Sequence, residues 1–199
     1  MSMKIAVLFP GIGYHADKPL LYYAGKLARS LGYEVIPLSY GGFPKKIAGD
    51  RQRMEQSFRI ALEQAEALLK DTDWERADEI LFLSKSIGTV VAGAYAARHL
   101  KDRAERVRHV LYTPVEATFD HICGQAAAFH GTADPWVTDE IVERRCAELS
   151  IALYEYPDAN HSLETGNVRT DLGTLRSVME ITDQFIRTTE NGGPNETAE

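Results

Sequence analysis

A serine, an aspartate and a histidine stand in that order in the sequence, and each follows a short apolar run. They are Ser86, Asp134 and His161. A serine hydroxyl is a poor nucleophile until a neighbouring imidazole takes its proton, and the imidazole needs a carboxylate to fix its tautomer and stabilise its positive charge. The three residue types therefore indicate nucleophilic catalysis if the fold brings them together.

Simpler interpretations of the same residues stay open at this point. Ser86 can be the N-cap of a following helix, Asp134 a turn residue before Pro135, and His161 a solvated surface histidine. Asp158 is a second candidate for the acid, although it lies only three residues before His161 on the same expected loop. The elements that position these residues decide between the interpretations.

Strand-like apolar runs alternate with segments of helical period along the whole chain. The expected strands span residues 4–9, 33–38, 79–83, 107–112, 125–130 and 151–156. The expected helices span about 20–31, 54–69, 87–99, 139–149 and 172–186. This alternation is typical of an α/β fold, a three-layer sandwich with a six-stranded parallel sheet covered by helices on both faces. Ligand chemistry in such sheets gathers at the carboxyl ends of the strands, where the three residues lie.

The third strand passes into the third helix without a loop, and Ser86 stands in the bend. The segment after it is rich in small apolar residues and too uniformly apolar to face water. A serine in so tight a strand-to-helix turn presents its side chain above the edge of the sheet, with the free N–H groups of the helix N-terminus beneath it. That position suits a nucleophile.

Composition sets the class of protein and of partner. The 199 residues predict one domain over residues 1–189, with a disordered polar tail over 190–199. The formal net charge of −7 argues against nucleic acid or an anionic membrane as the main partner. Two cysteines, Cys123 and Cys146, are too few for a disulfide framework, and no export signal or membrane anchor is recognised. We therefore expect a cytoplasmic protein.

Three short motifs in this order resemble the α/β-hydrolase superfamily, and in particular its small dienelactone-hydrolase-like and short carboxylesterase branches. The segment SKSIG at 84–88 resembles the nucleophile elbow, HGTAD at 130–134 the acid loop, and NHS at 160–162 the histidine loop. The first position of the elbow is Ser84 instead of the usual glycine, and serine is still small enough for the close approach required there. The resemblance covers residues 3 to about 188.

The resemblance carries expectations about roles and architecture. It implies that Ser86 is the nucleophile, His161 the base and Asp134 the orienting acid. It also implies an oxyanion hole made by the backbone N–H groups of Ile87 and Ile12. The expected sheet order is 2-1-3-4-5-6, and the segment 113–123 is too short to hold a cap domain.

Further candidates surround this constellation. Side chains and glycines that could contact a substrate are Gly11, Gly13, Tyr14, His15, Tyr40, Phe43, Lys85 and Trp136. The aromatic members are equally compatible with core packing. Lys85 could lie near the mouth of the site and favour substrates that bear a carboxylate, although an exposed, solvated lysine is the simpler expectation. No metal-ligand spacing is recognised and no cofactor is required.

Two other functional classes compete with the hydrolase. Gly11-x-Gly13-x-x-Ala16 follows a strand and precedes a helix, as in a dinucleotide-binding fingerprint. Such a site also wants an acid at the end of the second strand, and the segment 35–40 contains none. The third class is a non-catalytic hydrolase fold that binds a ligand.

The sequence thus favours a serine hydrolase that cleaves a small ester or thioester through an acyl-enzyme. Without a lid, the expected site is shallow and open, suited to short or polar acyl compounds. Carboxylesterases, thioesterases, amidases and lactonases share this constellation, so the leaving group stays open, as does the oligomeric state.

Overall fold

The structure, a computed structural model, describes residues 2–188; the expected tail at 190–199 lies outside this range. Six strands form one sheet in the order β2-β1-β3-β4-β5-β6, and every neighbouring pair is parallel. The strands are β1 (Met3–Phe9), β2 (Glu34–Pro37), β3 (Ala77–Lys85), β4 (Val107–Tyr112), β5 (Gln125–Gly131) and β6 (Ala152–Tyr156). The predicted fold class and strand order are confirmed.

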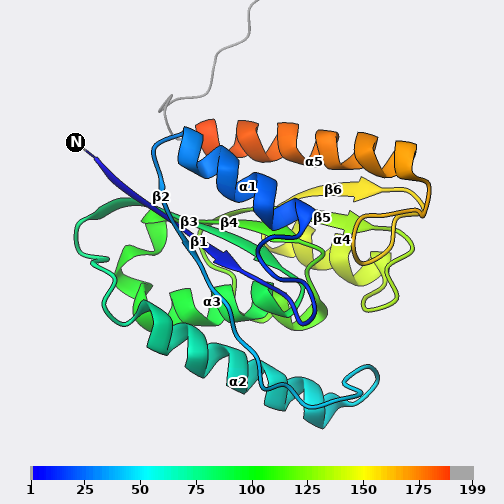
Figure 1. The fold of residues 1–199 in the computed structure, drawn as a ribbon, viewed down its shortest axis with the longest axis horizontal. Coiled ribbons are helices and arrows are strands. Elements are labelled where there is room, and N and C mark those ends of the chain that lie inside the picture. The colour runs from blue at the N-terminus through cyan, green and yellow to red at the C-terminus, as the bar shows by residue number, and fades with distance from the viewer. Residues whose placement is uncertain (1, 189–199) are drawn as a thin grey trace, which may run out of the picture.

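Helices cover both faces of this sheet (Figure 1). The α-helices are α1 (Pro19–Ser30), α2 (Arg51–Leu69), α3 (Ile87–His99), α4 (Asp139–Glu148) and α5 (Val168–Arg187). Helices α1 and α5 lie together on one face, and α2 and α3 lie on the other. Two short 3₁₀ helices that the sequence did not predict, Lys101–Arg106 and Glu116–Asp120, flank β4. The second occupies the segment where a cap domain would sit, so the fold is lidless.

The alternation of side chains along each strand divides the core into layers. In β1, Val7 faces the α2 and α3 side, whereas Leu8 faces the α1 and α5 side. Both side chains are almost completely buried. The inner strands β1, β3, β4 and β5 are therefore largely buried on both faces, whereas the edge strands β2 and β6 are partly exposed.

The helix boundaries follow capping signals in the sequence. Asp50 caps α2 by accepting a hydrogen bond from the N–H of Arg53, and Asn167 caps α5 through the N–H groups of its first turn. Helix α3 has no such side-chain cap, and its first ten residues, 87–96, are all buried. Helix α3 is therefore a buried helix that is held in place by apolar packing on all sides of its first ten residues, unlike an amphipathic surface helix.

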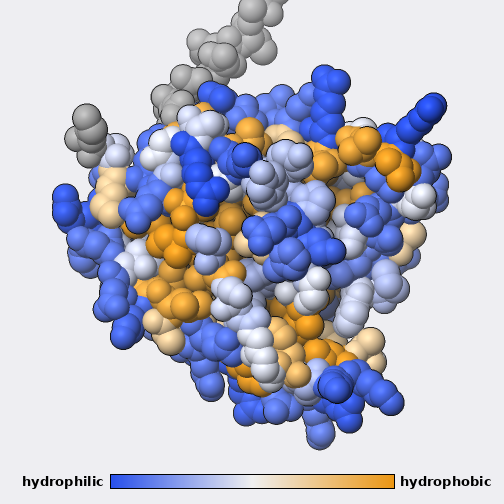
Figure 2. All heavy atoms as spheres, in the orientation of Figure 1, coloured by the Kyte–Doolittle hydropathy of each residue, from blue (hydrophilic) through white to orange (hydrophobic). Residues whose placement is uncertain are grey.

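The surface is mostly hydrophilic, with apolar areas between the polar side chains (Figure 2). One such area lies over the start of α5, where Val168 and Leu172 are 71% and 62% exposed. None of the helices within residues 2–188 is long and apolar enough to span a membrane.

Gly88, in the first turn of α3, lies directly against the end of β1. A Cβ atom at this position would lie 2.2 Å from the carbonyl oxygen of Phe9 and 2.6 Å from that of Pro10. We expect Gly88→Ala to lower the free energy of unfolding by about 2 kcal/mol or more, because backbone must move to make room. Urea denaturation measures the change.

The matched control is Gly173→Ala in α5, where no atom outside the adjoining backbone of the helix lies within 4 Å of the added Cβ. There the substitution should raise the free energy of unfolding by about 0.5–1 kcal/mol, because alanine favours the helix. Equal effects of the two substitutions would show that the contact between α3 and β1 is looser than the structure has it.

His109 is a fully buried ring on β4, packed edge-on against Phe82 with the ring centroids 5.6 Å apart. Burial lowers its pKa from 6.5 to about 4. As the pH falls from 6.5 towards 4, His109 becomes protonated in the unfolded chain but stays neutral in the folded protein. The free energy of unfolding therefore falls over this pH range. Replacing the ring should remove this contribution.

Between pH 7 and pH 4.5 the free energy of unfolding of the native protein falls partly because of His109. We therefore expect this fall to be smaller by about 2 kcal/mol in His109→Leu. Chemical denaturation at both pH values gives the comparison. An unchanged pH dependence in the variant would mean that His109 takes up its proton as readily in the folded protein as in the unfolded chain.

Candidate active site

Ser86 is the one residue between β3 and α3, and its backbone is strained. Its φ and ψ are 56° and −128°, a conformation that non-glycine residues rarely adopt and that costs on the order of 1–3 kcal/mol. Hydrogen bonds on both sides hold it there. The N–H of Ser86 donates to the carbonyl of Tyr112 at 3.1 Å, and the hydroxyl of Thr89 donates to the carbonyl of Ser86 at 2.6 Å. This backbone conformation is accompanied by a Ser86 hydroxyl that lies within hydrogen-bond distance of His161.

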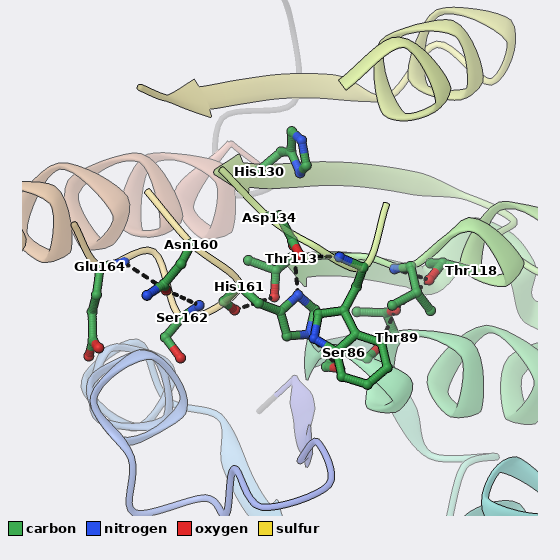
Figure 3. A network of polar contacts seen from close by, with 12 residues as sticks. Ser86, Thr89, Thr113, Thr118, His130, Asp134, Asn160, His161, Ser162 and Glu164 are labelled. Atoms are coloured by element: carbon green, nitrogen blue, oxygen red, sulfur yellow. Dashed lines mark hydrogen bonds and ion pairs between the residues drawn. The ribbon is translucent and has the colours of Figure 1, made fainter. Parts of the chain in front are cut away.

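The structure brings Ser86, His161 and Asp134 together in one chain of hydrogen bonds (Figure 3). The Ser86 Oγ lies 2.8 Å from His161 Nε2, and His161 Nδ1 lies 2.6 Å from Asp134 Oδ2. The other carboxylate oxygen, Oδ1, accepts a hydrogen bond from the backbone N–H of Trp136 at 2.9 Å. With Nδ1 donating to the carboxylate, Nε2 is free to accept the serine proton, which is the arrangement that general-base activation requires.

Burial and charge keep the imidazole of His161 in its neutral form. The Asp134 side chain is 0% exposed and the His161 side chain 18% exposed. Burial lowers the pKa of His161, and the hydrogen bond that His161 donates to Asp134 opposes this shift without cancelling it. The indole of Trp136, 41% exposed, lies 5.7 Å from the imidazole, measured between ring centroids. His161 is therefore a base that is ready to accept a proton at neutral pH.

Two polar residues to which the sequence analysis gave no role, Thr113 and Asn160, hold the histidine loop. The hydroxyl of Thr113 donates to the carbonyl of His161 at 3.0 Å. The Asn160 side chain accepts the N–H of Ser162 at 2.7 Å, which closes the turn around His161 (Figure 3). Thr113 directly follows β4, so its place at a strand end was a signal that could have found it.

The first loop, residues 10–18 between β1 and α1, forms a tight turn against Ser86. Gly11 and Tyr14 exchange two backbone hydrogen bonds of 3.0 and 3.3 Å, which leave the N–H groups of the intervening Ile12 and Gly13 outside the turn's own bonding. A Cβ added to Gly11 would lie 3.1 Å from the Ser86 Cβ, so the turn touches the serine. Ile87 is the first residue of α3, where N–H groups lack an acceptor within the helix. Ile87 directly follows Ser86, and the Gly11–Tyr14 turn contacts Ser86 from the other side.

The structure also separates candidates that the sequence left together. Asp158 does not bond to His161; its backbone N–H donates to the hydroxyl of Thr132 and fixes the loop after β6. Lys85 is 1% exposed, so the prediction of a lysine at the mouth of the site is wrong. Lys85 is the last residue of β3, and its side chain points into the α1 and α5 side of the core, as the strand alternation requires.

Two clefts flank the first loop, and Tyr14 lines both. The first, of about 370 Å³, brings together most of the predicted substrate-binding residues and is lined by Pro10, Gly11, Gly13, Tyr14, His15, Ala16, Asp17, Pro37, Leu38, Ser39, Tyr40 and Phe43. The second, of about 380 Å³, lies between the start of α1 and the segment 162–175. Trp136 lines neither cleft but stands beside His161.

The same loop fits a dinucleotide less well. In the fingerprint the third small residue opens the helix, so that the helix N-terminus faces the pyrophosphate. Here Ala16 precedes the helix, which begins at Pro19. Asp17 is the one acid that lines the adjacent cleft, and it comes from the first loop and not from the end of β2. Within residues 2–188, no cluster of three His, Cys, Asp or Glu side chains could hold a metal ion.

Comparison with solved structures shows the same fold in small hydrolases. Est1E from Butyrivibrio proteoclasticus is similar with a TM-score of 0.69 at 11% identity, over 95% of this chain and 89% of that one. XC6422 from Xanthomonas campestris, an α/β serine hydrolase without a lid, gives 0.62 at 16% identity over 98% and 86%. The esterase Pf2001 from Pyrococcus furiosus gives 0.62 at 15% identity over 94% and 83%. No protein-family model and no curated protein matches the sequence. The chain has the fold of lidless α/β hydrolases.

Proposed function

We propose that the protein is a serine hydrolase that cleaves a small carboxylic ester. The observation that carries the proposal is the continuous hydrogen-bonded chain from the Ser86 hydroxyl through His161 to the buried carboxylate of Asp134. A structural serine cap needs no imidazole, and a surface histidine needs no buried carboxylate. The similarity in fold to esterases supports the same class of reaction.

The reaction follows from the positions of these groups. Ser86 Oγ attacks the acyl carbon while His161 Nε2 takes the hydroxyl proton, so a bond from Oγ to carbon forms as the carbonyl oxygen gains negative charge. The backbone N–H groups of Ile87 and Ile12 are the proposed donors to that oxygen. The bond to the leaving group then breaks, and His161 returns the proton to the departing alcohol. In the second half of the reaction, water attacks the acyl carbon while His161 takes its proton. The bond from carbon to Ser86 Oγ then breaks, His161 returns the proton to Ser86, and the carboxylic acid leaves.

Two clefts border the first loop, and their size suits a small substrate, although Ser86 and His161 line neither of them. Each has a volume of about 370 to 380 Å³ and opens to solvent without a lid over it. The ring of Tyr40 meets that of Phe43 edge-on at 6.3 Å, which gives the first cleft an aromatic wall. Est1E is known with ferulic acid bound, so short aromatic acyl esters belong in the substrate panel beside short aliphatic esters and thioesters.

The test is covalent labelling of the native protein with a fluorophosphonate, followed by intact-mass measurement and peptide mapping. We expect one adduct, on the peptide that contains Ser86, and hydrolysis of short p-nitrophenyl esters that falls as the label is incorporated. A protein that hydrolyses none of the esters and carries no adduct on Ser86 would contradict the proposal. Tight binding of NAD(H) by calorimetry in that case would support the dinucleotide interpretation instead.

A further inference from the structure

Lys85 is a buried lysine at the end of β3, next to the proposed nucleophile in the chain. It precedes Ser86 in the sequence, and its side chain is among the largest that the fold encloses almost completely. Within residues 2–188 its ammonium makes no hydrogen bond and no ion pair within 4 Å. Its Nζ lies over the face of the Tyr14 ring, 5.1 Å from the ring centroid. A cation placed in this way is expensive to bury, so a role for its charge has to be considered.

The ionisable groups around Lys85 come from four separate segments. Tyr14 belongs to the first loop, and Tyr112 is its register partner on β4, on the same face of the sheet. Burial raises the pKa of Tyr14 to about 12 and that of Tyr112 further, so both phenols are neutral near pH 7. Asp134 attracts the ammonium, and the ammonium in turn acts on His161. The nearby charge that favours the protonated amine is therefore the carboxylate of the proposed catalytic pair.

Tyr14 carries the effect of Lys85 to the first loop. It closes the turn with Gly11, and its hydroxyl accepts the N–H of Leu20 at 3.1 Å at the start of α1. The ammonium on its ring face is the third point that fixes this side chain. Since the turn touches Ser86, the position of the Tyr14 ring sets where the N–H groups of the turn lie.

From this arrangement we infer that Lys85 is a positioning residue of the hydrolase site: its ammonium holds the Gly11–Tyr14 turn through the Tyr14 ring and opposes a positive charge on the resting His161. The inference rests on the proposed function of Ser86, His161 and Asp134. It differs from the sequence-based expectation in that Lys85 acts from the core, through Tyr14, and does not contact substrate.

The charge of Lys85 responds to pH in the range where a hydrolase works. Burial lowers its pKa from 10.5 to about 7, and Asp134 limits that shift. Below this value the amine is charged and makes His161 harder to protonate, which extends the active form of His161 to lower pH. Removing the charge therefore raises the pKa of His161 and moves the acid limb of the reaction to higher pH.

The experiment measures the rate of Ser86 labelling by a fluorophosphonate from pH 5 to pH 9. In Lys85→Met we expect the acid limb to move up by about half to one pH unit and the maximal rate to fall about tenfold. Lys85→Arg keeps the charge and should retain the native acid limb. Tyr14→Leu should lower the maximal rate about tenfold with the acid limb at its native pH, since the ammonium is still present. Lys18→Met, at an exposed lysine, serves as the control for loss of a charge.

The outcomes separate this inference from the proposed function. If Ser86 of the native protein takes no label, the proposed function fails. If Ser86 is labelled but Lys85→Met keeps the native acid limb and a maximal rate within twofold, the positioning role of Lys85 is overturned. Melting temperatures identify variants that do not fold, and if Lys85→Met is one of them, Lys85→Gln and Tyr14→Leu decide the question by the same two readouts.

Discussion

Ser86→Ala should lose ester hydrolysis by roughly 10⁴ to 10⁶-fold and should take up no fluorophosphonate. The variant keeps the hydrogen-bond donors of the proposed oxyanion hole and the clefts, so the residual rate should still exceed that of water. It should also fold at least as well as the native protein, because alanine removes the hydroxyl without changing the backbone contacts of the turn. Steady-state rates on the best ester of the panel, with thermal melts, give both results.

Ser30→Ala is the matched control, since Ser30 is an exposed serine at the C-terminal end of α1 and lines neither cleft. Its activity should stay within about twofold of the native value. If Ser86→Ala retained native activity, the nucleophile would lie elsewhere. A native protein that binds esters but never turns them over would point to the non-catalytic alternative.

Asp134→Asn should lower kcat/KM by roughly 10⁴-fold while leaving the fold intact. The reason is the direction of the two hydrogen bonds at this side chain. Oδ1 accepts the N–H of Trp136, and Oδ2 accepts Nδ1 of His161. In asparagine the amide oxygen keeps the Trp136 contact, so the NH₂ group faces Nδ1 and selects the tautomer in which Nε2 carries the proton. His161 would then donate to Ser86 and could not accept from it.

The control for this prediction is Asp158→Asn, because Asp158 lies on the same loop as His161 without bonding to it. Its kcat/KM should change by less than about threefold. The pH profile adds a second readout. The Asp134 carboxylate raises the pKa of His161, so in Asp134→Asn that pKa should fall and the acid limb should move to lower pH. Equal losses in the two variants would contradict the assignment of Asp134 as the orienting acid.

The parts of the fold that could be predicted are those with a repeating physical signal. Continuous apolar runs gave the strands within about two residues, because a sheet covered on both faces leaves no place for polar alternation. The 3₁₀ helices at Lys101–Arg106 and Glu116–Asp120 were missed since they are too short to show a period. The strand order came from resemblance to a family and not from the pattern itself.

At the site, a residue's position at a strand end correctly predicted which side chains meet, but the sequence did not predict which side chains are buried. Ser86, Asp134 and His161 meet because three parallel strands end at the same edge of the sheet. Lys85 was misplaced because lysine is normally solvated, and nothing in the local pattern shows that Tyr14 covers it from the first loop. Thr113 was overlooked because its partner is a backbone carbonyl 48 residues away.

The 75 residues that separate Ser86 from His161 have a consequence for how the molecule is made. The histidine follows β6, an edge strand that pairs with β5 alone, so the contact with the serine cannot form before the last two strands have joined the sheet. Such non-local contacts close late and slowly in folding, whereas helices form early from local signals. The reactivity of Ser86 is therefore a reporter of the completed chain, and its recovery after dilution from denaturant should lag behind the return of helical structure.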